Sequence, residues 1–127
     1  MITRALIVAG LFLSITAALQ LGSPEYIDAD VARRLVGVMM GAIVVLYANS
    51  VPKQLTPLAA MRCSPATEQA IRRFTGLSLV LGGLGFALAW IVAPIEAANA
   101  VAGAVLGIAL LAVALRYAAV FARRSPD

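Results

Sequence analysis

The chain of 127 residues contains little charge, and this scarcity decides its class. Charged residues make up 13% of the sequence, whereas soluble domains usually contain ~25%. Four windows contain no charged residue at all: residues 5–24, 35–52, 74–95 and 97–115. Each is close in length to the ~20 apolar residues with which a helix crosses a bilayer. A water-soluble bundle is excluded, because these windows lack the polar stripe that a helix exposes to water.

Histidine is absent, and Cys63 is the only cysteine. The chain therefore cannot form an internal disulfide or supply the histidine and cysteine ligands of a zinc site. The central parts of the four windows also lack the ionisable side chains that proton-coupled pumps place inside the membrane. Without a converging acid, base or nucleophile, we expect no catalytic residues, no metal, no cofactor and no enzymatic activity.

The distribution of the basic residues predicts the orientation, because Lys and Arg are retained on the cytoplasmic side. If the N-terminus is cytoplasmic, only Arg33 and Arg34 lie outside. All other basic residues then lie inside: Arg4, Lys53, Arg62, Arg72, Arg73, Arg116, Arg123 and Arg124. We therefore expect a multi-pass protein of a bacterial inner membrane with both termini in the cytoplasm. These residues act as topology signals or contact anionic lipid headgroups at the cytoplasmic face, and nothing in their pattern indicates a nucleic-acid partner.

The spans are expected to form one transmembrane domain over residues 1–127, an all-α antiparallel up-down bundle of four helices. The expected helices cover residues 4–22, 30–51, 65–93 and 96–122. We expect the first window to remain as a span, because its uncharged stretch exceeds the ~7–15 residues of a signal-peptide core.

Helix boundaries are indicated by capping residues and prolines. Asp28 or Asp30 can cap the second helix, and Pro52 ends it because proline has no N–H to donate. Ser64-Pro65 combines a capping hydroxyl with a proline at the first helical position, which favours the start of the third helix. Pro94 closes this helix before a very short turn, so the third and fourth helices should form a tight hairpin.

Small residues four positions apart predict where helices approach each other closely. Apolar side chains gain nothing by leaving lipid for protein, so close contact between backbones is the main cohesive term. The candidate pairs are Gly37 with Gly41, Gly103 with Gly107, Ser78 with Gly82, and Gly10 with Ser14. We expect them to pack within one chain, although a homo-oligomer stays open.

Polar residues cluster where the second helix ends and the third begins. The candidate contacts for a partner or a lipid headgroup are Asn49, Pro52, Lys53, Arg62, Arg72, Arg73 and Gly76. A purely structural interpretation stays open: Asn49 can hydrogen-bond the carbonyls that Pro52 leaves free, and Gly76 can be a packing contact. The functional interpretation is a basic pocket for an anionic headgroup, a peptide terminus or a partner loop.

The same stretch resembles a known family. Ala48-Asn49-Ser50-Val51-Pro52-Lys53 is similar to the asparagine–proline–lysine step that ends a spanning helix in the SdpI-type immunity protein family. In that family a loop arginine follows, where Arg62 stands here, and residues 68–76 resemble its approach to the next span; Ile71 replaces a usual tryptophan. The resemblance covers about residues 37–89 and implies a similar membrane fold. Family members are linked to self-protection against a secreted peptide toxin and to sequestering a regulator at the membrane.

Three classes of function follow from these features. We expect a non-catalytic accessory, immunity-like or sensing protein that uses the basic cytoplasmic loop between the second and third helices. One alternative is a transporter or channel subunit that forms a polar path as an oligomer. The other is a small stabilising subunit of a larger membrane complex. In each case lipid surrounds the helices, and a protein partner or a second copy is the expected contact.

Overall fold

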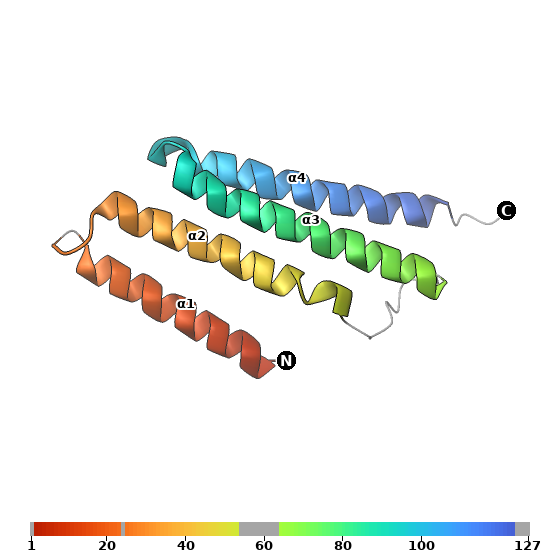
Figure 1. Ribbon diagram of the computed structural model, residues 1–127, viewed down its shortest axis with the longest axis horizontal. Helices are drawn as coiled ribbons and strands as arrows, with labels where there is room; N and C mark the ends of the chain where they lie inside the picture. Colours follow the sequence, from red (N-terminus) through yellow and green to blue (C-terminus); the bar gives the residue numbers. More distant parts are fainter. Residues whose placement is uncertain (1, 24, 54–63, 124–127) are drawn as a thin grey trace.

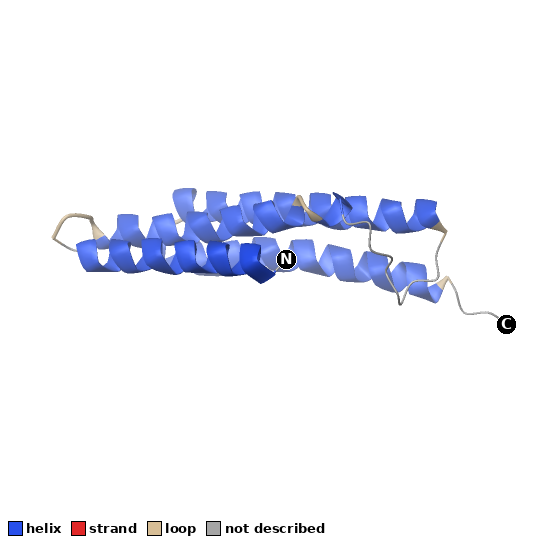
Figure 2. Ribbon diagram, turned by 90° about the horizontal axis from the view of Figure 1, so that it is seen from below, coloured by secondary structure: helices blue, strands red, loops and turns tan. Residues whose placement is uncertain are grey.

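Four α-helices make up most of the described chain, and each is long and apolar enough to span a membrane. The computed structural model describes residues 2–23, 25–53 and 64–123. The helices are α1 (Ile2–Gly22), α2 (Ala29–Ala48), α3 (Pro65–Val92) and α4 (Ile95–Ala122), and a short 3₁₀ helix, η1 (Val51–Lys53), follows α2. Successive helices run in opposite directions along one long axis (Figure 1; Figure 2). The predicted all-α architecture with four such helices is confirmed.

The helices lie in a row rather than around a closed central core. Figure 1 shows α1, α2, α3 and α4 in succession, and the main helix contacts are α1 with α2, α2 with α3, and α3 with α4. This open arrangement keeps the antiparallel up-down order of the expected bundle (Figure 1). It leaves most large apolar side chains exposed, which is tolerable in lipid because hydrocarbon is as apolar as leucine.

The end of α2 is determined by Pro52. Because proline lacks an N–H, the carbonyl four residues earlier, that of Ala48, loses its helical donor. The α-helix accordingly ends at Ala48, earlier than the expected residue 51. The chain then tightens to 3₁₀ geometry, in which the N–H of Lys53 donates to the carbonyl of Ser50 at 3.1 Å.

Side-chain caps begin α2 and α3. The Asp28 carboxylate accepts a hydrogen bond from the N–H of Asp30 at 2.8 Å, which identifies Asp28 as the cap of α2. The hydroxyl of Ser64 accepts from the N–H of Thr67 at 3.4 Å, and Pro65 follows it at the first helical position. Only Ala93 and Pro94 separate α3 from α4, and the two helices pack along their length as the predicted tight hairpin.

Glycines bring α2 and α3 into backbone contact. A Cβ on Gly41 would lie 2.7 Å from the carbonyl oxygen of Gly83 and 2.9 Å from the backbone nitrogen of Ala87. A Cβ on Gly37 would overlap the indole ring of Trp90. The structure thus places both predicted packing glycines of α2 against α3, at distances that only a hydrogen atom permits.

On its other side, α3 packs against alanines of α4. A Cβ on Gly82 would lie 2.6 Å from the Cβ of Ala109, and Ala98, Ala102 and Ala109 are buried. The predicted packing pair of α4, Gly103 and Gly107, does not take part: both face open space and are exposed. Each helical residue turns the side chain by about 100°, so Gly103 points away from the face that Ala102 buries.

α1 packs far more loosely than the other helices. No residue from Thr3 to Gly22 is buried, and a Cβ on Gly10 would meet nothing within 4 Å. The hydroxyl of Ser14 donates to the carbonyl of Gly10 at 2.8 Å, within the same helix. The small-residue pair on α1 therefore contacts no other helix in the described chain.

Arg34 of α2 caps the C-terminal end of α3. Its Nη1 atom donates hydrogen bonds to the carbonyls of Trp90 at 2.7 Å, Ile91 at 3.0 Å and Ala93 at 3.0 Å. These carbonyls lie in the last turn of α3 and beyond it, where helical donors are missing. The positive charge also lies at the negative end of the helix dipole. Arg34 therefore fastens α2 to α3 at the end opposite Pro52.

Candidate functional site

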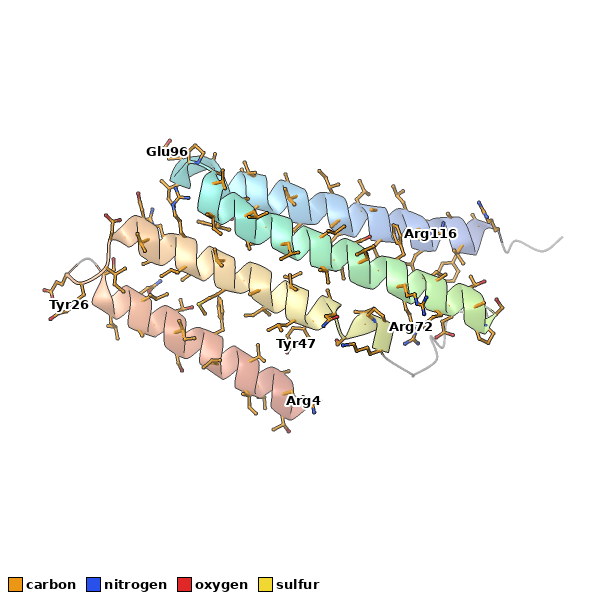
Figure 3. The ribbon with its side chains drawn as sticks, in the orientation of Figure 1. Arg4, Tyr26, Tyr47, Arg72, Glu96 and Arg116 are labelled. Atoms are coloured by element: carbon orange, nitrogen blue, oxygen red, sulfur yellow. The ribbon has the colours of Figure 1, made fainter. Side chains whose placement is uncertain are left out.

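The basic residues of α3 and α4 lie beyond the uncharged windows, at one end of the molecule. Both helices have 28 residues, a length of about 42 Å, whereas a hydrocarbon core is ~30 Å thick. Arg72 and Arg116 lie toward the end where α3 begins and α4 ends (Figure 3). This end extends past α1 and α2 in Figure 1. If the helices span a bilayer, this surplus length places the charges outside the hydrocarbon.

The most unusual residue at this end is Arg72, which is only 5% exposed. Its Nη2 and Nε atoms lie 2.6 Å and 3.2 Å from Oε1 of Glu68, one helical turn earlier. A buried guanidinium without a counter-charge would be costly, and the carboxylate offsets that cost only while the geometry is maintained. Figure 3 shows Arg72 close to the junction between α3 and η1. The pair is thus a rigid, charged element of the fold.

Gly76 allows η1 to lie directly on α3. A Cβ at this position would lie 2.7 Å from Cγ of Pro52 and 3.2 Å from the carbonyl oxygen of Ala48. A weak hydrogen bond also joins α3 to η1: Nε2 of Gln69 donates to the carbonyl of Pro52 at 3.5 Å. The packing interpretation of Gly76 therefore agrees with the structure, and the packing partner is the proline turn.

Residues 69, 72, 73 and 76 follow the i, i+3, i+4, i+7 spacing of one helix face. Since Gln69 and Gly76 both contact Pro52, this is the face that α3 presents to η1. Arg73 is the exposed charged residue of this face, and Lys53 of η1 is exposed as well. We call this set the junction site; its members are Asn49, Pro52, Lys53, Glu68, Gln69, Arg72, Arg73 and Gly76.

The structure brings together most of the residues that the sequence singled out. Arg72 and Gly76 form the buried part of the junction site, Pro52 is half-buried, and Lys53 and Arg73 form its exposed part. Arg62 lies outside the described residues. Asn49 is exposed and follows the last residue of α2, where its N–H donates to the carbonyl of Val45.

Asn49 was expected to hydrogen-bond carbonyls at the end of α2, but Ser50 forms such a bond instead. Within the described chain, no hydrogen bond involves the Asn49 side chain. The hydroxyl of Ser50 instead donates to the carbonyl of Tyr47 at 2.6 Å. Sequence reasoning also missed the pairing of Glu68 with Arg72, although their i, i+4 spacing on one helix is the signal for it.

A second feature of this end is a groove between α3 and α4, of about 540 Å³. Two arginines, Arg116 and Arg123, line it together with Ser64 and Thr67 at the start of α3. The guanidinium of Arg116 lies 5.8 Å from the centre of the Phe74 ring, a cation–π distance. Cations, hydroxyls and the positive end of a helix dipole together suit a phosphate group. Sequence reasoning counted these arginines as basic residues of the inner face but did not place them in a groove.

The described residues contain no group of three or more metal-ligating side chains. Two buried hydroxyls form no hydrogen bond within the described chain, that of Thr75 on α3 and that of Thr16 on α1. The chemistry available at this end is therefore recognition of anions by arginine and hydroxyl groups.

No model of a known protein family, no curated protein and no solved structure matches the chain. The resemblance of residues 37–89 to the SdpI-type family therefore stays a prediction.

Proposed function

We propose that this chain is a non-catalytic accessory protein of a bacterial inner membrane, of the immunity or sensing kind, with both termini in the cytoplasm. In this proposal the junction site is the surface that contacts a partner. The exposed side chains of Asn49, Lys53 and Arg73 make the contact, and Arg72 with Glu68 positions them.

The buried Arg72 is the single observation that carries the proposal. A charge at the edge of a membrane can remain in water at little cost, yet here a guanidinium is almost wholly enclosed beside Glu68. Burying two charges costs several kcal/mol for each ion, and a buried pair is retained in some proteins because it selects one conformation. Arg72 also shares its helix face with Gly76, which fits against Pro52. The pair therefore supports a site whose shape is set before a partner arrives.

The partner that suits this surface carries negative charge. Lys53 and Arg73 are both exposed, and neither forms an ion pair with a described residue. An acidic loop or the carboxylate end of a peptide would satisfy both cations. The neighbouring groove with Arg116 and Arg123 suits the phosphate of an anionic lipid at the same face. A lipid there would hold this end of the molecule at the membrane surface.

The test is complementation of a gene deletion, scored for resistance to peptide toxins and to envelope stress. The double variant Lys53→Gln/Arg73→Gln removes two exposed cations from the junction site. It should abolish complementation at an unchanged membrane level, since exposed substitutions alter stability by less than about 0.5 kcal/mol. The control is Arg4→Gln, which removes an exposed cation from α1, away from both the junction site and the groove, and should complement normally.

A second variant separates positioning from contact. Glu68→Gln leaves the charge of Arg72 without its carboxylate, and it should weaken both complementation and thermal stability. Full complementation by the Lys53→Gln/Arg73→Gln variant would contradict the proposal.

One observation favours an alternative, a stabilising subunit of a larger membrane complex. Gly103 and Gly107 leave an open small-residue face on α4 that another helix can approach closely. In the complementation experiment this alternative predicts that Gly103→Leu fails and the junction variants succeed.

A further inference from the structure

A cavity of about 560 Å³ lies at the end of the molecule opposite the junction site. It lies between α1, α2 and α3, and Asn99 of α4 also lines it. Its volume falls within the ~300–1,000 Å³ range of small-molecule sites. The cavity exists because α1 packs loosely, which leaves space between Leu19 of α1 and Trp90 of α3.

The cavity is elongated along α2 and changes in polarity along its length. Its α2 lining extends from Ala29 to Met40, and a helix rises about 16 Å over that distance. Gln20, Ser23 and Arg33 line the end near the α1–α2 connection. Deeper in, beyond Val36, α2 and α3 contribute apolar side chains and the indole of Trp90, whose buried N–H has no hydrogen-bond partner within the described chain. Such a shape suits an amphiphile with one charged end and one long apolar chain.

The two outer arginines have different roles. Arg34 donates three hydrogen bonds to carbonyls at the end of α3. Arg33 lines the cavity and forms no hydrogen bond or ion pair with any described residue, including Asp30 one turn earlier. The acidic residues of this end, Glu25, Asp28, Asp30 and Glu96, do not line the cavity. The charge that faces a ligand there is therefore positive.

We infer that this cavity binds one anionic phospholipid of the surrounding bilayer. The phosphate of the headgroup contacts Arg33, and Gln20, Ser23 and Asn99 supply further polar contacts. One acyl chain follows α2 between α1 and Trp90. Packed protein interiors do not sustain a void of this size, and acyl chains are the apolar matter that reaches a cavity between spanning helices. The ligand thus replaces the helix contacts that α1 lacks.

Trp90 makes the inference measurable, because it is the only tryptophan of the chain and lines the cavity. The full chain is reconstituted into phosphatidylcholine vesicles, and part of the lipid is replaced by lipid with brominated acyl chains, which quench indole fluorescence on contact. Brominated phosphatidylglycerol is compared with brominated phosphatidylcholine. We expect the anionic lipid to quench at about fivefold lower mole fraction, which corresponds to the ~1 kcal/mol attraction of one basic residue for an anionic surface.

Two pairs of variants show where the quenching lipid binds. Arg33→Gln should remove the preference for the anionic lipid, whereas Arg73→Gln, at the other end, should retain it. Val36→Phe should narrow the apolar part of the cavity beside α2 and reduce quenching by the anionic lipid toward the level of phosphatidylcholine. Leu88→Phe adds the same ring on the exposed face of α3, where Leu88 is 57% exposed, and should change nothing. Circular dichroism confirms that each variant keeps its helix content.

Two results would overturn the inference. One is equal quenching by both brominated lipids in the unmodified chain, which indicates ordinary contact with the lipid around the helices. The other is an anionic preference that survives both Arg33→Gln and Val36→Phe, which places the lipid elsewhere. Neither result affects the proposal for the junction site, which lies at the opposite end.

Discussion

α1 and α3 are equally apolar, yet only α3 is packed. The mean hydropathy of the spanning window is 2.0 for α1 and 1.9 for α3, but 28% of the α3 window is buried and none of the α1 window. In water this difference would be surprising, because apolar surface drives burial. In lipid it is expected, since an apolar side chain loses nothing by facing hydrocarbon.

What distinguishes the two helices is the position of their small residues relative to a neighbour. Gly82 and Gly83 of α3 face α4 and α2, respectively, and admit other side chains or backbone atoms at short range. Gly10 of α1 faces open space. The comparison indicates that α2, α3 and α4 form the closely packed unit. α1 is held by its connection to α2, by its few contacts with α2, and by the molecule that fills the cavity beside it.

The strongest test of this comparison is Gly41→Leu. Its Cβ would meet the backbone of α3 at Gly83 and Ala87, and backbone atoms cannot rotate away as a side chain can. Overpacking usually costs about 1–3 kcal/mol, and we expect the upper end of this range or more. The free energy of unfolding is measured by titration of mixed micelles with a denaturing detergent, followed by Trp90 fluorescence. Gly103→Leu is the matched control; if it destabilises the protein equally, α4 has a second contact face.

A smaller effect is expected from Arg34→Gln, which releases one end of α2 from α3. The variant loses three hydrogen bonds from a charged donor to the carbonyls of Trp90, Ile91 and Ala93. Bonds to charged groups contribute ~1.5–3 kcal/mol, and because these three share one nitrogen we expect a loss of about 1.5 kcal/mol. The same titration measures it.

Two variants serve as controls for Arg34→Gln, one at the adjacent Arg33 and one at Arg34 itself. Arg33→Gln removes the same charge from a residue without protein partners, and in micelles that contain no anionic lipid it should change stability by less than about 0.5 kcal/mol. Arg34→Lys should recover part of the loss, because it keeps the charge without the guanidinium fork. Equal destabilisation by Arg33→Gln and Arg34→Gln would show that net charge, not capping, stabilises this end.

Much of the fold could be predicted because it depends on local chemistry. Uncharged stretches of sufficient length indicate spans. The caps at Asp28 and Ser64, and the turn at Pro94, follow from the properties of single residues. The end of α2 differed by one helical turn, because the effect of Pro52 starts at the carbonyl four residues before it.

The packing could not be predicted in the same way. Gly41 and Gly103 belong to motifs of the same type on different helices. Gly41 nevertheless lies against the backbone of α3, whereas Gly103 faces open space. The motif indicates that another helix could pack closely against these glycines. Whether one does so depends on how the helix is rotated about its axis. Likewise the basic cluster was evident, but which of its arginines is buried, Arg72 and not the adjacent Arg73, depends on the rotation of α3 against its neighbours.

The smallest expected effect belongs to Gly10→Leu, the counterpart of Gly41→Leu on the loosely packed helix. Because nothing lies within 4 Å of the added Cβ, the new side chain displaces only lipid. Replacing a helical glycine also removes its ~1 kcal/mol propensity cost, so stability should stay unchanged or rise slightly. The titration used for Gly41→Leu gives a direct comparison. A loss of 1 kcal/mol or more at position 10 would mean that α1 packs against a partner in the membrane, and cross-linking at increasing protein-to-lipid ratio would then show whether that partner is a second copy of this chain.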